Sequence, residues 1–235
     1  MTVLESSRYA RQIALPEIGK DGQLKIRNSK VFIVGCGALG SMVAMQLAGA
    51  GIGEIGIADF DTIDITNLQR QFFFKDIEAG ESKSVVLNKR INELNPDVDV
   101  KLFNEFVSKN NFTGLIADYD IVIDATDNPD SKKMIDDGCL ILNKPCIIAG
   151  VSGFKGQVMT IMPDDIRFNE IFPETEEEGF LPCSLGGVSG PVAALCASIQ
   201  VSEALKIILN IGETLSNKLL IFNLLNNKFE IFNLK

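Results

Sequence analysis

The sequence contains no histidine, and this absence excludes a large part of enzyme chemistry. A catalytic triad that uses histidine, or any general acid–base mechanism that uses imidazole, is not available to this chain. The five cysteines are scattered and form no CxxC pair, so zinc sites of the usual kind are not expected. An odd, dispersed set of cysteines indicates a reducing compartment instead of a disulfide framework.

Long hydrophobic runs are also missing. Charges or glycines interrupt the apolar stretches before they reach the roughly 18 residues that would suggest a membrane span. Residues 1–20 carry charges throughout and have no apolar core, unlike a signal peptide. The formal net charge is −9, which argues against nucleic acid or an anionic membrane as the main partner. We therefore expect a cytoplasmic protein with no nucleic-acid or membrane partner.

Strands and helices alternate in the pattern of an α/β fold. Lys30–Val34 and Glu54–Ala58 read as buried strands on either side of the helix Ala38–Ala50. Such a βαβ unit implies a parallel sheet. Further elements follow along the chain: strands at 98–103, 121–123, 146–149, 157–162, 218–224 and 228–234, the last two as a hairpin around Asn226 and Asn227, and helices at 131–142 and 191–209.

This pattern predicts a Rossmann-like, mainly parallel twisted sheet flanked by helices, with antiparallel strands near the C-terminus. We expect a single domain over residues 1–235. Residues 1–28 would form an N-terminal helical segment and residues 29–150 a nucleotide-binding core. Residues 151–235 would add a strand, a mobile loop at about 163–187, a helix and the C-terminal hairpin.

A glycine-rich turn stands where the first strand meets the first helix. Gly35, Gly37 and Gly40 form a G-x-G-x-x-G, in which glycines let the backbone approach a phosphate at a helix N-terminus. Asp59 ends the next strand, at the distance where a carboxylate can take both hydroxyls of a ribose. The turn predicts a nucleotide site but does not choose the nucleotide, so an NAD-dependent oxidoreductase remains a possible alternative at this point.

A second set of residues, all polar except Leu68, follows the second and fourth strands. It consists of Asp61, Thr66, Asn67, Leu68, Gln69, Arg70 and Lys83, and then of Asp127 and Asn128. Each member has a simpler interpretation: Asp61 and Asn67 could cap turns, Arg70 and Lys83 could be surface charges, and Asp127-Asn128 could cap a helix. Their joint occurrence at the carboxyl ends of parallel strands favours a ligand site.

From about Arg8 onward these motifs resemble the ThiF/MoeB/HesA family, the bacterial relatives of ubiquitin-activating enzymes, and most closely its ThiF type. The matching segments are Arg8-Tyr9-Ala10-Arg11-Gln12, the glycine turn, Ala58-Asp59-Phe60-Asp61, Asn67-Leu68-Gln69-Arg70-Gln71, Lys83, Thr126-Asp127-Asn128 and the stretch from Cys183 to Val192. The resemblance implies an ATP-dependent adenylyltransferase. Its substrate would be the C-terminal glycine carboxylate of a small β-grasp sulfur carrier that resembles ThiS or MoaD and ends in Gly-Gly, in thiamine, molybdopterin or a related biosynthesis.

The resemblance also implies roles for individual residues. Asp59 would bind the ribose, and Asn67, Arg70 and Lys83 the phosphates. Ala38 and the backbone around Thr66, with Leu68 and Gln69, would lie near the nucleotide. Asp127 would hold Mg²⁺, with Asn128 beside it, and Arg70 and Asp127 would be catalytic. Arg11 would reach the ATP of the other subunit of a homodimer. The attacking carboxylate is already ionised at neutral pH, so no general base is needed and the missing histidines are no objection.

The chain departs from the family pattern in its cysteines. Many relatives carry two CxxC pairs that bind a structural zinc, but residues 166–173 lack the first pair and no second pair follows. We expect no zinc, with the corresponding loop held by packing alone or left mobile. Cys183 matches a cysteine that can form a covalent link to the carrier, although it could equally be a simple loop cysteine. A peptide-adenylating enzyme and a catalytically silent relative remain as alternatives.

Overall fold

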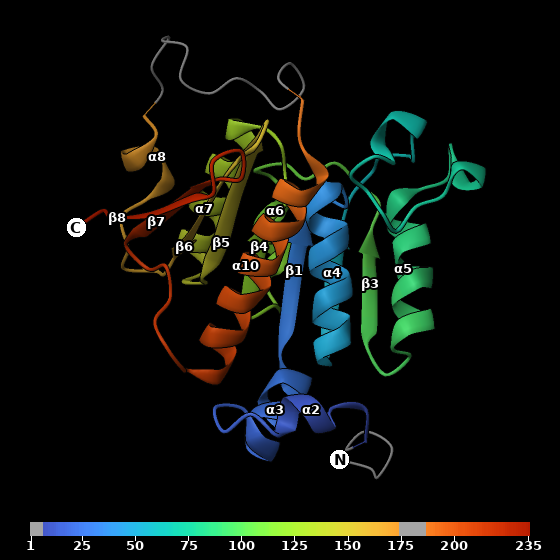
Figure 1. The fold of residues 1–235 in the computed structure, drawn as a ribbon, viewed down its shortest axis with the longest axis horizontal. Coiled ribbons are helices and arrows are strands. Elements are labelled where there is room, and N and C mark those ends of the chain that lie inside the picture. Colours follow the sequence, from blue (N-terminus) through green and yellow to red (C-terminus); the bar gives the residue numbers. More distant parts are fainter. Residues whose placement is uncertain (1–6, 174–186) are drawn as a thin grey trace.

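The computed structural model describes residues 7–173 and 187–235, which form a layered α/β structure around an eight-stranded sheet (Figure 1). The strand order is β3-β2-β1-β4-β5-β6-β7-β8. The parallel part contains β3 (Asp99–Phe103), β2 (Glu54–Ala58), β1 (Lys30–Val34), β4 (Ile121–Asp124) and β5 (Cys146–Ser152). The antiparallel part contains β6 (Lys155–Ile161), β7 (Lys218–Asn223) and β8 (Lys228–Asn233). The predicted fold class is confirmed.

The sheet has a topological switch between β1 and β4. From β1 the chain proceeds to β2 and β3 on one side, and it then returns to the other side to form β4 and β5. Helices on opposite faces separate at such a point and leave a crevice at the carboxyl ends of the strands. The order of the strands therefore predicts where a ligand would bind.

Helices cover both faces of the sheet (Figure 1). On one face α4 (Ala38–Ala50), α5 (Lys83–Leu94) and α10 (Gly190–Leu209) pack against side chains such as Ile33. The other face carries α6 (Phe112–Ile116) and α7 (Pro129–Ile141), which enclose Phe32. Successive residues of β1 point to opposite faces, so this apolar strand contributes to both cores.

The N-terminal helices lie at the end of the molecule where the parallel strands begin. They are α2 (Ala10–Ile13) and α3 (Gly19–Asn28) (Figure 1). Gln12 donates a hydrogen bond to the carbonyl of Ala50 at 2.9 Å, which ties this segment to the C-terminal end of α4. The first helices are thereby fixed one helix length away from the glycine turn.

Helix α10 has the length and composition of a membrane-spanning segment, alone among the helices of the described residues. Half of its most apolar window is nevertheless buried. Cys196 and Val201 on this helix belong to the same core as Ile33 of β1. This burial is typical of a central helix that packs against a sheet.

The segment before residue 174 is more structured than the sequence suggested. It contains α8 (Phe168–Ile171), inside the range of about 163–187 that was expected to be a mobile loop; residues 174–186 lie outside the described part. Asp136 of α7 accepts hydrogen bonds from the backbone N–H of Phe168 at 2.9 Å and from the guanidinium of Arg167. Buried polar contacts as well as packing therefore hold the part of this segment before residue 174, whereas packing alone or a mobile loop was expected.

Candidate functional site

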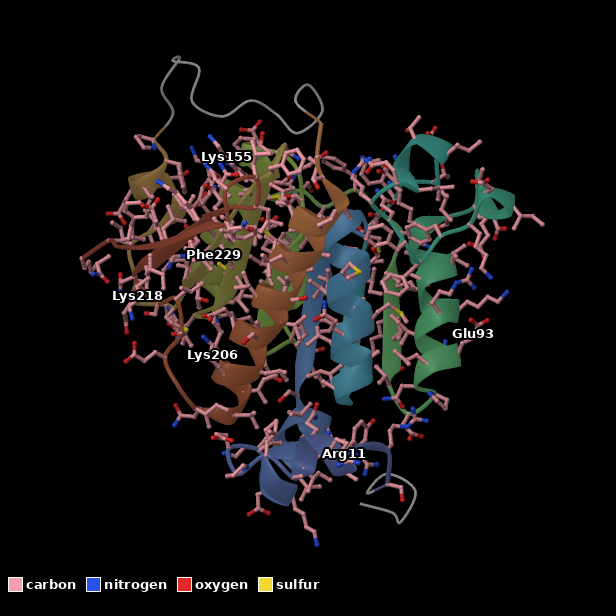
Figure 2. All side chains as sticks on the ribbon, in the orientation of Figure 1. Arg11, Glu93, Lys155, Lys206, Lys218 and Phe229 are labelled. Carbon is pink, nitrogen blue, oxygen red and sulfur yellow. The ribbon has the colours of Figure 1, made fainter. Side chains whose placement is uncertain are left out.

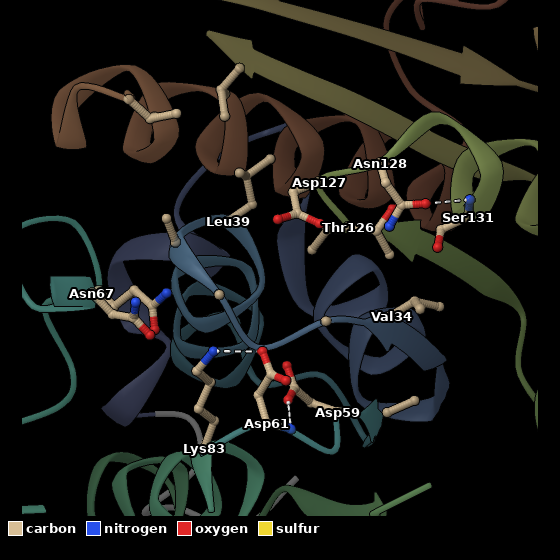
Figure 3. A pocket seen from close by; sticks show the side chains of 18 of the residues that line it. Val34, Leu39, Asp59, Asp61, Asn67, Lys83, Thr126, Asp127, Asn128 and Ser131 are labelled. Carbon is tan, nitrogen blue, oxygen red and sulfur yellow. Dashed lines mark hydrogen bonds and ion pairs between the residues drawn. The ribbon is translucent and has the colours of Figure 1, made fainter. Parts of the chain in front are cut away.

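A cavity of about 880 Å³ opens at the carboxyl ends of the parallel strands, at the switch point between β1 and β4. Its walls come from the glycine turn, the segment after β2, the start of α5, the turn after β4 and the end of β5. Figure 3 shows Asp127 on one side of this space and Asn67 and Lys83 on another. The structure thus brings together residues that lie far apart in the sequence.

The glycine turn has the close backbone contacts that its sequence predicts. Gly35 has a φ of +97°, and a Cβ there would meet the carbonyl oxygen of Ala125 at 2.8 Å. A Cβ on Gly40 would lie 1.8 Å from the carbonyl oxygen of Gly35, so Gly40 is required for packing and does not line the cavity. A Cβ on Gly37, by contrast, would meet no atom closer than 3.7 Å. Gly37 therefore leaves room for a ligand at the N-terminus of α4.

Asp59 is held by backbone N–H groups. Its Oδ2 accepts from Cys36 at 2.5 Å and its Oδ1 from Asp61 at 2.7 Å. Burial raises the pKa of this carboxyl, although the two hydrogen bonds lower it in part. Each carboxylate oxygen keeps a further lone pair, so Asp59 can still accept from ribose hydroxyls.

Lys83 and Arg70 supply positive charge to the cavity wall. The ammonium of Lys83, at the first position of α5, donates to Oδ2 of Asp61 at 2.9 Å. Nη1 of Arg70 donates to the carbonyl of Thr66 at 3.2 Å. Thr66 in turn donates its N–H and its hydroxyl to Asp64 at 2.8 and 2.6 Å, which starts the short 3-10 helix Ile65–Asn67. The two cations therefore sit on rigidly anchored backbone.

The turn after β4 presents Asp127 to the cavity. The side chain of Asp127 is exposed and lines the open space (Figure 3). Its neighbour Asn128 has a different task, because Oδ1 of Asn128 accepts the N–H of Ser131 at 2.8 Å and caps α7. The helix-cap interpretation thus holds for Asn128, while Asp127 stays available to a ligand.

Carboxylates outnumber cations along the cavity. Five acidic residues line it, namely Asp59, Asp61, Asp64, Glu105 and Asp127, against the three basic residues Arg70, Lys83 and Lys132. A polyphosphate would be repelled by such a wall unless further positive charge entered with it. The described residues alone therefore do not complete an anion site.

An aromatic pair stands at the rim of the cavity. The rings of Phe60 and Phe106 lie 5.5 Å apart in an edge-on arrangement, with exposures of 61% and 69%. Both residues line the cavity. Large apolar side chains with this exposure offer a flat surface to an aromatic ligand.

The sequence matches the ThiF family over residues 9–235. The chain belongs to the ThiF family. It is 36% identical over 206 residues to the sulfur carrier protein ThiS adenylyltransferase of Escherichia coli K12, covering 87% of this chain and 82% of that protein. It is 35% identical over 217 residues to the probable adenylyltransferase/sulfurtransferase MoeZ of Mycobacterium tuberculosis, covering 90% of this chain. The chain spans 55% of the length of MoeZ.

Solved structures agree with this family assignment. The crystal structure of Escherichia coli MccB superposes with a TM-score of 0.85 at 25% identity, covering 97% of this chain and 70% of that one. The structure of MccB with ATP superposes with a TM-score of 0.83 at 26% identity, covering 97% and 71%. The shared architecture extends over almost the whole ThiF-family chain.

Three of the predicted site residues lie elsewhere. Leu68 packs against the hydrophobic core and Gly40 against the turn, and neither lines the cavity. Arg11 is exposed at the opposite end of the molecule (Figure 2). Cys183 falls outside the described residues. The other predicted residues line the cavity: Gly35, Gly37, Ala38, Asp59, Asp61, Thr66, Asn67, Gln69, Arg70, Lys83, Asp127 and Asn128.

Sequence reasoning did not identify several residues of this ThiF-family cavity. Gln71 and Lys132 both line it and are 4% and 2% exposed. Gln71 is the last residue of the matching segment that begins at Asn67, so its position beside Arg70 could have identified it. Lys132 carried no signal, because a lysine in the first turns of a helix is ordinarily a surface residue.

Residues 7–173 and 187–235 hold no group of three or more cysteine, aspartate or glutamate side chains placed to bind an ion. Asp127 therefore stands at the cavity as a single carboxylate and does not belong to such a group. One carboxylate together with substrate phosphates is the usual environment of Mg²⁺ in nucleotide-using enzymes.

Proposed function

We propose that this chain is an adenylyltransferase that uses Mg-ATP to activate the C-terminal glycine carboxylate of a small β-grasp sulfur carrier. One observation carries the proposal: a single cavity joins the glycine turn and Asp59 with Arg70, Lys83 and Asp127. This combination supplies a ribose acceptor, phosphate donors and a metal ligand in one place. The names of several relatives, including the ThiS adenylyltransferase, point to the same activity.

The reaction would transfer AMP to the carrier. A carboxylate oxygen of the carrier forms a bond to the α-phosphorus, the bond between that phosphorus and the bridging oxygen to the β-phosphate breaks, and pyrophosphate leaves. Two anions must meet for this step, so the protein must neutralise negative charge at fixed positions. Arg70 and Lys83, which are anchored through Thr66 and Asp61, would do so without reorganisation.

The composition of the cavity wall supports a need for Mg²⁺. Carboxylates exceed cations there, so the triphosphate requires charge from outside the described wall. Asp127 fits as the protein ligand because its side chain is exposed to the cavity. When bound, Mg²⁺ would supply charge neutralisation at the phosphates, while Asp127 would fix the place at which it does so.

The extent of the cavity supports two substrates. Asp59 directly follows β2, and Gly150 and Val151 near the end of β5 line the same space three strands away in the sheet. The exposed pair Phe60 and Phe106 lies on the Asp59 side and suits an adenine base. The β5 side, which also includes Gly187 and Val188, is then the place for a carrier tail of two glycines.

A homodimer would add a further cation, Arg11 of the other subunit, to each cavity. Gln12 bonds to the end of α4 while Ala38 at its start lines the cavity, and a helix of 13 residues spans roughly 20 Å. Arg11 therefore cannot reach its own cavity.

An apolar face suits the interface of such a dimer. The outer faces of α4 and α10 carry the partly buried residues Met42, Met45, Leu195 and Ile199, and α4 has no charged residue. A two-fold axis through this face, perpendicular to the strands, would bring Arg11 to the partner's cavity.

The proposal is tested by incubating the protein with Mg-ATP and candidate carriers that end in Gly-Gly. Mass spectrometry should show the mass of AMP added to one carrier, and ATP–pyrophosphate exchange should depend on that carrier. Arg70→Ala and Asp127→Ala should each lower exchange about 100-fold or more. Binding of NAD in place of ATP, or exchange unchanged in both variants, would contradict the proposal.

A peptide substrate is the second candidate. Escherichia coli MccB in a structure with SeMet MccA superposes with a TM-score of 0.84 at 25% identity. The C-terminal carboxylate of a short peptide is the same attacking group as that of a carrier, so the proposed chemistry would not change. The same assay separates the two, because a peptide library with free C-termini would support exchange while folded carriers would not.

A further inference from the structure

A buried lysine lies directly beneath the turn that carries Asp127. Nζ of Lys132, from the first turns of α7, donates to Oδ2 of Asp124 at 2.6 Å, to the carbonyl of Thr126 at 2.9 Å and to the carbonyl of Ala149 at 2.7 Å. All three N–H groups of the ammonium are used. The bonds join the end of β4, the turn after it and β5 through one atom.

The remaining contacts of Asp124 complete a closed network. Its Oδ1 accepts the N–H and the hydroxyl of Thr126 at 3.1 and 2.6 Å. From the opposite face of the sheet, Nε2 of Gln200 in α10 donates to the carbonyl of Asp124 at 2.7 Å and to that of Ile147 at 3.1 Å. The backbone from 124 to 126 is therefore fixed from both faces, and Asp127 is the next residue.

Burial of the charges of Asp124 and Lys132 has a large desolvation cost, so stability alone does not account for the network. Asp124 and Lys132 are 0% and 2% exposed, and a buried ion pair is often no more stabilising than apolar residues of similar volume. A lysine, however, holds a carbonyl and a carboxylate at defined distances, which an apolar side chain cannot do. The location at the cavity wall connects this rigidity with the proposed magnesium ligand.

We propose that Lys132 is a positioning residue that fixes the turn 124–127 so that Asp127 meets the metal of bound Mg-ATP. This inference rests on the proposed function, because it presupposes that Asp127 holds Mg²⁺. Lys132 itself is saturated by protein acceptors and does not bind phosphate. Its removal should weaken the contribution of magnesium to ATP binding and leave metal-free ATP binding almost unchanged.

The first experiment measures ATP affinity with Mg²⁺ and with EDTA, and the ratio of the two dissociation constants gives the magnesium gain. Lys132→Met should reduce this gain at least fivefold, while the dissociation constant in EDTA stays within twofold of the wild-type value. Lys132→Arg should restore part of the gain, since a guanidinium can also donate to Asp124 and to carbonyls. Lys144→Met is the matched control: Lys144 also donates to a backbone carbonyl, that of Tyr119, at the other end of the sheet.

The second experiment separates positioning from general stability. In the Asp127→Asn background, Lys132→Met should change the magnesium gain by less than twofold, although it should still lower the melting temperature. Hydrogen exchange should accelerate at residues 124–128 in Lys132→Met and remain unchanged in β7 and β8. If Lys132→Met does not fold, Asp124→Asn should give the same loss of gain.

The outcomes are distinguishable. An intact magnesium gain in folded Lys132→Met, or losses that multiply in the double variant, would overturn the role of Lys132 while the proposed activity stands. A wild-type protein without any magnesium gain would overturn both this inference and the magnesium site of the proposed function.

Discussion

The ammonium of Lys83 and Oδ2 of Asp61 lie 2.9 Å apart at the wall of the cavity. The lysine side chain is 8% exposed and the aspartate side chain 55% exposed. Solvent therefore reaches the aspartate but hardly reaches the lysine. Asp61 uses one of the three N–H groups of Lys83 and leaves the ammonium at the cavity wall, where the proposed function places a phosphate. The pair thus orients the cation in the absence of nucleotide.

Opposite effects are expected when the two members of this pair are replaced. Lys83→Met removes a phosphate donor and should weaken ATP binding about 10- to 100-fold. Asp61→Asn removes a negative charge beside the triphosphate, so ATP should bind more tightly while turnover in the exchange assay falls because Lys83 is no longer oriented. Isothermal titration and exchange kinetics on both variants check this, and equal weakening by both would contradict the orienting role of Asp61.

The acid side of the pH profile should be governed by Asp59. Burial raises the pKa of this carboxyl, and protonation removes an acceptor for the ribose hydroxyls. ATP affinity should therefore fall on acidification at a higher pH than an ordinary aspartate would give. Asp59→Asn should bind ATP weakly at every pH and lose this acid limb, as fluorescence titration from neutral to acidic pH would show.

The same raised pKa has a defined effect on stability. Because the folded state favours the protonated form, the contribution of Asp59 to stability is complete below the unfolded pKa and is lost as the pH rises through the folded pKa. Asp59→Asn should therefore not destabilise the protein at neutral pH through loss of charge. A large fall in melting temperature at pH 7 would instead assign the carboxylate a structural role through Cys36 and Asp61.

Two glycines of α4 should respond to alanine in opposite directions. A Cβ on Gly40 would collide with the carbonyl oxygen of Gly35 at 1.8 Å, so Gly40→Ala should cost about 3 kcal/mol or more and disturb the turn. Gly49 is exposed on the same helix, with its nearest neighbour at 4.0 Å, so Gly49→Ala should stabilise by about 0.5–1 kcal/mol. Urea denaturation of both variants tests the pair, and similar effects would contradict the geometry of the turn.

The four described cysteines should be unreactive in the native protein. Cys36, Cys139, Cys146 and Cys196 are all buried free thiols. Burial raises the pKa of Cys196 to about 12 and, with the charge of Asp59, raises that of Cys36 as well. At pH 8 a thiol with a pKa near 12 is ionised to about one part in ten thousand. The Cys183→Ser chain should therefore react with Ellman's reagent only after denaturation, and fast native labelling would contradict this assignment.

The first βαβ unit was predicted most accurately from the sequence. Lys30–Val34, Ala38–Ala50 and Glu54–Ala58 have the same bounds in the structure, since apolar side chains and glycines specify them locally. The start of α7 was placed two residues too late, at residue 131: a cap at Asp127-Asn128 was considered, but the helix begins directly after Asn128, at Pro129. α8 was missed because its anchors, Asp136 and Phe168, meet only in the folded chain.

The candidate site was predictable where the backbone geometry itself requires particular residues at particular spacings. The glycine turn and Asp59 are of this kind, because the turn needs glycine and the acid follows at a fixed element length. Lys132 was not predictable, since its three acceptors come from segments that the fold brings together. Leu68 shows the reverse error: its place in a polar motif suggested the site, but its apolar side chain turns into the core.

The location of Arg11, a helix length from the cavity of its own chain, has a consequence for how active centres would be assembled. If each centre takes its arginine from the neighbouring copy, dilution below the dissociation constant of the dimer should lower the activity per milligram of protein. Mixing inactive Arg11→Ala chains with inactive Asp127→Ala chains should then regenerate one fully equipped centre in every hybrid pair. Catalysis would in that case belong to the assembly, and neither chain alone would possess it.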